Sequence, residues 1–157
     1  MTEIYKASEE LLRRTNISQK EYERLYEYSI EKPESFWEEQ TERLTWVKKP
    51  TIIKNTQFTS PVSIKWYEDG ILNACYNCVD RHLADRAQST ALIFEGNDAN
   101  ESYKISYEEL KNEVCKTANA LKERGVKKGD RVTIYMPMVP EAVYAMLACA
   151  RLSLIHI

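Results

Sequence analysis

The sequence predicts an α/β fold, in which an N-terminal region of helices and extended chain precedes the first strand–helix units of a sheet-based domain. Three observations lead to this class. Two segments carry helix-start signals ahead of helical apolar spacing, two neighbouring short segments have the pattern of a β-hairpin, and strands and helices alternate after residue 80. With 157 residues, the chain is long enough to bury one core.

The first helix is marked by its start and its end. Ser18 and Glu21 have the spacing of a capping box, in which the serine accepts from the Glu21 amide. One side of the predicted helix has residues that recur with helical spacing: Tyr22, Leu25, Tyr26 and Ser29 or Ile30. Pro33 ends this helix and opens a second short one, which carries Phe36 and Trp37.

Residues 46–61 lose helical periodicity and indicate extended chain. Residues 62–67 alternate as a strand does, with Val62, Ile64 and Trp66 on one side, and residues 68–70 form a turn. Five aromatic residues are predicted to form a small core that holds the N-terminal segment in place, rather than a binding platform: Phe36, Trp37, Trp46, Trp66 and Tyr67.

The second half begins with a predicted helix over 73–86, followed by a hairpin of 90–95 with 102–106 around the turn "NDANES". Ser106 and Glu109 form a second capping box, which opens a helix over 107–124. Its buried stripe is predicted from residues three or four apart: Leu110, Val114, Ala118 and Leu121. Gly125 stands where a helix-ending glycine belongs.

A strand is predicted over 131–136, in a larger sheet, and Pro140 suits the first turn of a helix over 140–151. That helix is apolar on nearly all sides and requires cover on more than one face. We expect an uncovered face to expose several of its residues, such as Val143, Met146, Leu147 and Cys149. Each large side chain then forgoes about 1.5–3 kcal/mol of burial, so the isolated chain is expected to aggregate or form a loose globule.

Composition excludes several classes of function. Lysine and arginine (22) nearly balance aspartate and glutamate (24), so neither nucleic acid nor an anionic membrane surface is a predicted partner. No segment approaches the length of an apolar membrane span, and the charged N-terminus lacks the core of a secretory signal. Four cysteines in this setting indicate reduced thiols and a cytoplasmic location.

Three residues have the types found in metal sites: Cys75, Cys78 and His82. On a continuous helix they share one flank, but a zinc site needs about four converging ligands, and no second ligand pair is present. The favoured interpretation is two half-buried thiols and a hydrogen-bonding histidine. Phosphate-binding loops are also missing, because the four glycines are scattered at 70, 96, 125 and 129.

From about Tyr22 to Arg151, the sequence resembles the N-terminal part of the AMP-forming acetyl-CoA synthetase family. The resemblance is carried by seven segments: "FW" (36–37), "IKWYEDGILN" (64–73), "NCVDRHL" (77–83), "ALIFEGND" (91–98), "ISYEEL" (105–110), "VKKGDRV" (126–132) and "YMPMVPEAVYAMLACAR" (135–151). It covers about 130 residues of a family whose members are several times longer. The family does not reserve position 75 for cysteine, which further weakens the metal interpretation.

The resemblance implies an acetate–CoA ligase that takes part in acetate metabolism. Acetate attacks the α-phosphorus of ATP to give acetyl-AMP and diphosphate, and coenzyme A then releases AMP. The parent protein would use ATP, Mg²⁺, coenzyme A and acetate. The family's catalytic groups lie downstream, so this chain is predicted to contain no catalytic, cofactor-binding or metal-binding residue and to be inactive alone.

The resemblance also implies domain limits. Residues 1–17 are predicted to be a tail, 18–79 the family's N-terminal cap, and 80–151 the beginning of the AMP-binding domain. Residues 152–157, "LSLIHI", fit the family poorly. They match a translation of CTG TCT CTT ATA CAC ATC, the transposon mosaic end of sequencing libraries, and are interpreted as translated adapter on a truncated chain.

Alternative functions remain open at this point. The parent could act on propionate instead of acetate, because the acyl pocket lies downstream of this chain. The chain could also be a stand-alone interaction module, which predicts a polar outer face on the last helix. A small metal protein built on Cys75, Cys78 and His82 is the third alternative.

Overall fold

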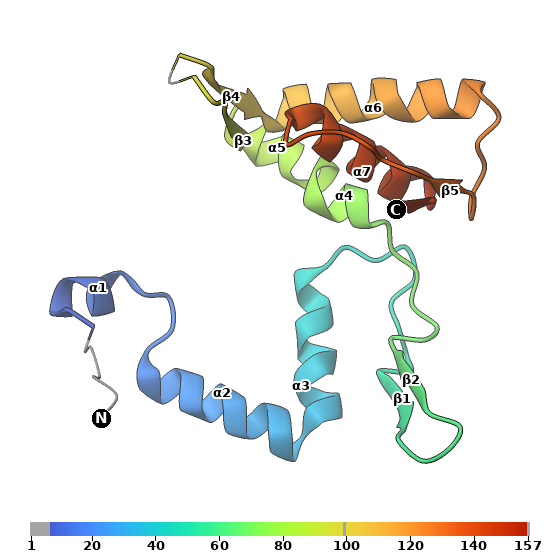
Figure 1. Cartoon of the computed structure of the whole chain (residues 1–157). Helices are drawn as coiled ribbons and strands as arrows, with labels where there is room; N and C mark the ends of the chain where they lie inside the picture. Colours follow the sequence, from blue (N-terminus) through green and yellow to red (C-terminus); the bar gives the residue numbers. More distant parts are fainter. Residues whose placement is uncertain (1–6, 99, 157) are drawn as a thin grey trace. The chain divides into compact units, whose positions relative to one another are not determined.

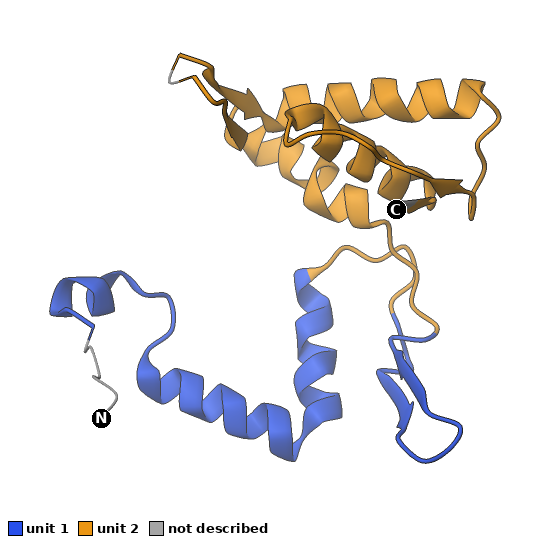
Figure 2. Ribbon diagram, in the orientation of Figure 1, with its two compact units in different colours: residues 1–43, 50–68 blue, residues 44–49, 69–157 orange. Residues whose placement is uncertain are grey.

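The computed structural model describes residues 7–98 and 100–156 and confirms the mixed helix-and-strand class. Parts of three predicted segments lie outside the described residues: 1–6 of the tail, 99 of the hairpin turn and 157 of the last six. The chain divides into two compact units (Figure 2). Unit 1 comprises residues 1–43 and 50–68, and unit 2 comprises residues 44–49 and 69–157.

Unit 1 begins with three helices, labelled in Figure 1: α1 (Glu9–Arg14), α2 (Gln19–Glu31) and α3 (Pro33–Gln40), the last followed by the 3₁₀ turn η1 (Thr41–Arg43). The Ser18 hydroxyl accepts from the Glu21 amide at 3.2 Å, as the capping pattern predicted. The Glu21 carboxylate accepts from Arg24, with a shortest distance of 2.7 Å. Pro33 is the first residue of α3, as predicted.

The predicted apolar side of α2 lies on the surface of the structure. This helix buries none of its residues, and Tyr22, Tyr26 and Ile30 are each more than half exposed. The spacing of these residues correctly predicted a helix, because spacing follows from helix geometry alone. Burial requires a neighbouring element to cover the stripe, which spacing does not supply.

The rest of unit 1 is an antiparallel hairpin, β1 (Lys54–Gln57) with β2 (Ser63–Trp66), in which Thr56 lies opposite Ile64. The segment predicted only as extended chain therefore contains a strand. Four of the five predicted aromatic residues belong to unit 1 and follow one another: Phe36, Trp37, Trp66 and Tyr67, with ring centroids 5.3, 5.8 and 6.4 Å apart. Trp37 and Trp66 remain about two-fifths exposed, so the cluster is a half-covered layer rather than a buried core.

In unit 2, the helix predicted over 73–86 is broken into α4 (Ala74–Cys78), the 3₁₀ turn η2 (Asp80–His82) and α5 (Leu83–Arg86). The break is at Val79, whose φ of −125° and ψ of −66° are not helical. Val79 is fully buried in the core of the unit. Because the helix ends at Cys78, His82 does not share the predicted flank with Cys75 and Cys78.

The hairpin was predicted correctly: β3 (Thr90–Glu95) pairs antiparallel with β4 (Ser102–Ser106), with an irregularity in the register between Thr90 and Leu92. Helix α6 (Tyr107–Glu123) follows directly. Its capping box is complete, because the Ser106 hydroxyl accepts from the Glu109 amide at 3.2 Å and the Glu109 carboxylate accepts from the Ser106 amide at 2.7 Å. These bonds to Ser106 lower the pKa of the Glu109 carboxyl.

Helix α6 ends as the sequence predicted. Gly125 has a positive φ of 81°, its amide donates to the Lys122 carbonyl, and the Val126 amide donates to the Leu121 carbonyl. This pair of bonds is the Schellman arrangement, which an L side chain at the glycine position would strain.

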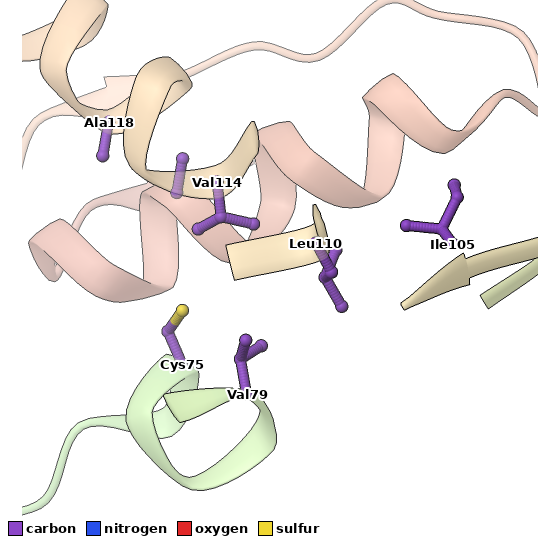
Figure 3. Packing of buried hydrophobic residues seen from close by; sticks show 7 residues of the cluster. Cys75, Val79, Ile105, Leu110, Val114 and Ala118 are labelled. Atoms are coloured by element: carbon purple, nitrogen blue, oxygen red, sulfur yellow. The ribbon is translucent and has the colours of Figure 1, made fainter. Parts of the chain in front are cut away.

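The core of unit 2 lies between α4, β4, α6 and α7 (Figure 3). Its buried members are Cys75, Val79, Ile105, Leu110, Val114, Ala118 and Ala148. Three of the four stripe residues predicted for α6 are therefore fully covered, and Leu121 packs against them at the edge. The apolar helix α7 (Pro140–Leu152) supplies the opposing surface.

Two predictions about the C-terminal part were wrong. Of the strand predicted over 131–136, only β5 (Arg131–Val132) forms, because a strand needs a partner and β6 (Ile155–His156) pairs in parallel with these two residues. Cys149, predicted to be exposed on α7, is fully buried. Met146 is exposed as expected, while Val143 and Leu147 are half-buried. Among the described helices, none has both the length and the apolar content needed to cross a membrane.

Replacing Ser106 with alanine should lower the free energy of unfolding by about 1 kcal/mol, because the first turn of α6 loses its side-chain acceptor. Urea denaturation followed by circular dichroism measures this change. Ser8→Ala is the matched control: Ser8 caps α1 through the Leu11 amide, but α1 buries no residue, so the unfolding midpoint should stay unchanged. Equal effects of the two substitutions would contradict the role given to the Ser106 cap.

Candidate functional site

Several polar side chains of unit 2 converge at Arg151, near the end of α7. We call Asn73, Asn77, Asp80 and Arg151 the Arg151 cluster. Nη2 of Arg151 donates to Oδ2 of Asp80 at 2.5 Å, across 71 positions of sequence. The Arg151 carbonyl accepts from Nδ2 of Asn73 at 3.0 Å. The last turn of α7 is therefore held to α4 and η2 by both its side chain and its backbone.

Asn77 connects this cluster to the short segment 44–49. Its Oδ1 accepts from the Thr45 amide at 2.8 Å, and its Nδ2 donates to the Thr45 carbonyl at 2.9 Å. The same side chain also accepts from Arg81 and donates to the Asn73 carbonyl. With 9% of its surface exposed, Asn77 is a buried amide whose hydrogen-bonding capacity is fully used.

Segment 44–49 is further paired with the chain just before α4. The Val47 and Lys48 amides both donate to the Ile71 carbonyl, at 2.8 and 3.1 Å, and the Ile71 amide donates back to Lys48. Asn73 begins α4, since its Oδ1 accepts from the Tyr76 amide at 3.0 Å. Short-range caps and one buried amide thus fix the backbone around the cluster.

An open hollow of about 380 Å³ borders the cluster, with walls that are largely apolar. It is lined by Thr45, Trp46, Val47, Asn73, Tyr76 and Arg151. Trp46, predicted to join the aromatic core, lies here in unit 2. Nε of Arg151 is buried without a hydrogen-bond partner among the described residues. A second, smaller hollow of about 160 Å³ is apolar and lies between β3 and the start of α7.

The electrostatics of the cluster favour an ion pair that stays charged. Burial disfavours the charge on Arg151. The hydrogen bond that Arg151 donates to Asp80, together with the negative charge of that carboxylate, outweighs burial and raises the pKa of the guanidinium. Burial raises the pKa of the Cys75 thiol, while Arg151 acts in the opposite direction. The Cys75 thiol is therefore neutral near pH 7 and packs in the core of the unit.

The residues considered for a metal site have separate surroundings. Cys75 is buried in the core, Cys78 is exposed, and the His82 ring lies against Tyr107 with centroids 5.4 Å apart. Among residues 7–98 and 100–156, no three or more histidine, cysteine, aspartate or glutamate side chains are grouped so as to hold a metal ion. The cluster itself pairs a cation with an anion and caps backbone groups. The cluster therefore has a structural role, in which it holds the end of α7 to α4 and η2.

Sequence reasoning missed this cluster, although a signal was present. Arg151 is the single cation in the otherwise apolar segment 142–152, and a cation at the end of a buried helix needs a partner. The acidic partner could not be chosen from spacing, because Asp80 lies on a different element far along the chain. Only the packing of α7 against α4 brings the two side chains together.

Two family models match the chain, and they meet without a gap. The model described as the acetyl-coenzyme A synthetase N-terminus matches residues 22–78, and the model described as AMP-binding enzyme matches residues 79–157. The second match covers half of the chain.

Curated relatives cover almost the whole chain. An acetyl-coenzyme A synthetase from Bradyrhizobium diazoefficiens is 54% identical over 154 residues, and one from Parvibaculum lavamentivorans is 55% identical over 155 residues. Each alignment covers 98% of this chain, and the chain spans 24% of the length of each relative. Among solved structures, acetoacetyl-CoA synthetase from Streptomyces lividans matches with a TM-score of 0.78 and 25% identity, over 87% of this chain and 21% of that one.

Replacing Arg151 with methionine should destabilise unit 2 by about 3 kcal/mol, because the half-buried Asp80 carboxylate loses its partner while the apolar stem is kept. Thermal or urea unfolding measures the loss. Lys116→Met is the matched control in the same unit, since Lys116 pairs with Glu113 on an exposed surface and should contribute about 0.5 kcal/mol or less. If both substitutions cost the same, the Arg151 cluster is not the fastening described above.

Proposed function

The chain belongs to the AMP-binding enzyme family, and we propose that it supplies the N-terminal part of an AMP-forming acetate–CoA ligase. In the complete enzyme, ATP and acetate would give acetyl-AMP and diphosphate, and coenzyme A would take the acetyl group. The chain spans about a quarter of the relatives' length, so the activity belongs to the larger protein. Acetate is favoured over propionate because the relatives named here are acetyl-coenzyme A synthetases.

The observation that carries this proposal is the uninterrupted pair of family matches. An acetyl-coenzyme A synthetase N-terminal match ends at residue 78, and the AMP-binding match begins at residue 79. A stand-alone interaction module would explain either match by itself. The N-terminal match followed directly by the AMP-binding match supports a ligase. Exposed Met146 on α7 also speaks against the polar outer face that a stand-alone module would need.

We assign the domains accordingly: 1–17 as a tail, 18–79 as the N-terminal cap and 80–151 as the beginning of the AMP-binding domain. Support comes from the position at which the two family matches meet. For residues 152–157 we keep the proposal of translated adapter. In the structure, part of this segment ends α7 and part pairs with β5, and the AMP-binding match extends through residue 157. The proposal therefore rests on the sequence of these six residues alone.

ATP, Mg²⁺ and coenzyme A are proposed for the complete ligase, and none of them fits the residues described here. A phosphate cradle needs glycine-rich backbone, but Gly125 ends a helix and Gly129 lies in the turn before β5. No group of side chains suited to a metal ion is found in the described ranges. We therefore assign no catalytic, cofactor-binding or metal-binding residue to this chain and derive no reaction step within it.

We also propose that the complete protein is cytoplasmic and acts on small molecules, with neither nucleic acid nor membrane as a partner. The four cysteines are all free thiols, which suits a reducing compartment. The near balance of acidic and basic residues supports small-molecule substrates over a polyanion.

A chimera tests the proposal. The first quarter of the Bradyrhizobium diazoefficiens relative is replaced by residues 1–151, and acetate-dependent exchange between ATP and diphosphate is measured. We expect the rate to stay within about tenfold of the relative, a difference of about 1.4 kcal/mol. A chimera ending at residue 157 should be weaker, because six adapter-encoded residues would then replace native ones.

The isolated chain and the relative without its first quarter are the controls, and both should give no exchange. A soluble, folded chimera without activity would contradict the proposal that this chain does the work of a ligase N-terminus. Exchange by the isolated chain would contradict the assignment of all catalytic residues to the rest of the protein.

A further inference from the structure

Two cysteines lie three residues apart on the same short helix, outside any function assigned above. Cys75 is fully buried and Cys78 is exposed, and both belong to α4. Residues three apart on a helix have Cβ atoms about 5–6 Å apart, and a disulfide needs about 3.5–4.5 Å. Helix geometry puts Cα atoms three residues apart at about 5 Å, within the range that a disulfide accepts. The two sulfur atoms therefore need only a small local closure.

The end of α4 allows that closure. Cys78 is the last residue of the helix, and Val79 has already left helical geometry. A shift of Cys78 toward Cys75 does not interrupt a following helical turn, as it would in the middle of a long helix. A disulfide closed at this spacing is strained and is easily reduced, which is the behaviour of reversible rather than structural bridges.

The two thiols have different surroundings that suit a sequential reaction. The sulfur of Cys75 points from α4 into the core (Figure 3), where solvent does not reach it. Burial raises its pKa, and the neighbouring Cys78 adds to this, which reflects how near the two groups are. Cys78 is the thiol that a dissolved oxidant meets first. Cys75 is protected until a reactive sulfur forms beside it.

We propose that Cys75 and Cys78 are a reversible thiol–disulfide pair that responds to peroxide. The Cys78 thiolate attacks one oxygen of hydrogen peroxide, and the O–O bond breaks. Cys78 becomes a sulfenic acid, and hydroxide is the leaving group. Cys75 sulfur then attacks the Cys78 sulfur, the S–S bond forms, and the sulfenic oxygen leaves as water with the Cys75 proton. In sum, two thiols lose two electrons and two protons, and one peroxide becomes two waters.

Formation of the bridge has a structural consequence. Cys75 sulfur must turn from the core toward Cys78, away from the guanidinium of Arg151 that influences it in the reduced chain. Asn73 and Asp80, which flank α4, hold the end of α7. Oxidation therefore acts on the same short stretch that fastens α7. The proposal does not depend on the ligase function.

Peptide mass spectrometry tests the pair in the intact chain. The chain is treated with hydrogen peroxide, denatured, labelled with N-ethylmaleimide and digested with trypsin. Cleavage after Lys65 and Arg81 puts Cys75 and Cys78 in one peptide, while Cys115 and Cys149 fall in two others. We expect peptide 66–81 from the oxidised chain to carry no label and to weigh two hydrogen atoms less than the unlabelled reduced peptide. When dithiothreitol is added before labelling, the peptide should carry both labels. The other two peptides should keep their labels at the same dose.

Variants separate the roles of the two sulfur atoms. In Cys75→Ser, the Cys78 sulfenic acid has no resolving thiol, so its dimedone adduct should rise several-fold over the unsubstituted chain. In Cys78→Ser, Cys75 should keep its label. Cys115→Ser is the matched control and should leave the bridge unchanged.

Three results would overturn the proposal. The first is retention of both labels at a dose that oxidises Cys115. The second is a disulfide from peptide 66–81 to another peptide. The third is irreversible oxidation of Cys78 in the unsubstituted chain as fast as in Cys75→Ser. All three are read in peptides, so they stand even if a variant folds poorly.

Discussion

The second unit depends on one constraint, the anchoring of the end of α7 at Arg151. The guanidinium is paired with Asp80, and the Arg151 carbonyl accepts a hydrogen bond from Asn73. The charge of Arg151 and its helix-end carbonyl therefore both have partners. The break in the helix at Val79 belongs to this arrangement. It buries Val79 in the core and starts a new turn at Asp80, beside the arginine. A continuous helix would carry Asp80 to a different angle, and the cation would remain unpaired in a half-buried place.

Around this anchor, the unit is built from local signals that agree with one another. The complete cap at Ser106 begins α6, Gly125 ends it, and the stripe of Leu110, Val114 and Ala118 meets α7 between these limits. The buried side-chain amide of Asn77 hydrogen-bonds to both the backbone amide and the carbonyl of Thr45. These bonds hold segment 44–49 to the rest of unit 2. Buried polar groups of this kind are costly when unpaired, which makes the pairing specific as well as stabilising.

This architecture supports the proposal that the reaction chemistry of the ligase lies outside this chain. Apart from Nε of Arg151, its convergent polar groups are hydrogen-bonded to one another, and its glycines serve turns and a helix end in the residues described. The parallel pair of β5 and β6 is two residues long on each side, with α7 as the crossover between them. In the ligase proposed above, such a unit would position a sheet and its covering helices, and phosphate and acyl chemistry would belong to other parts of the protein. The thiols of α4 are a reactive feature that lies outside this proposed role.

The sequence by itself determined the local elements, and the tertiary structure decided which of them meet. Helix starts and ends at Ser18, Pro33, Ser106 and Gly125 were predictable, because caps and backbone conformations depend on neighbouring residues only. The stripe of α6 followed from spacing for the same reason. The break at Val79, the burial of Cys149 and the shortening of β5 were not predictable, because each depends on an element distant in sequence. The Arg151–Asp80 pair is the clearest case: the sequence supplied an unpaired cation, and only helix packing supplied its partner.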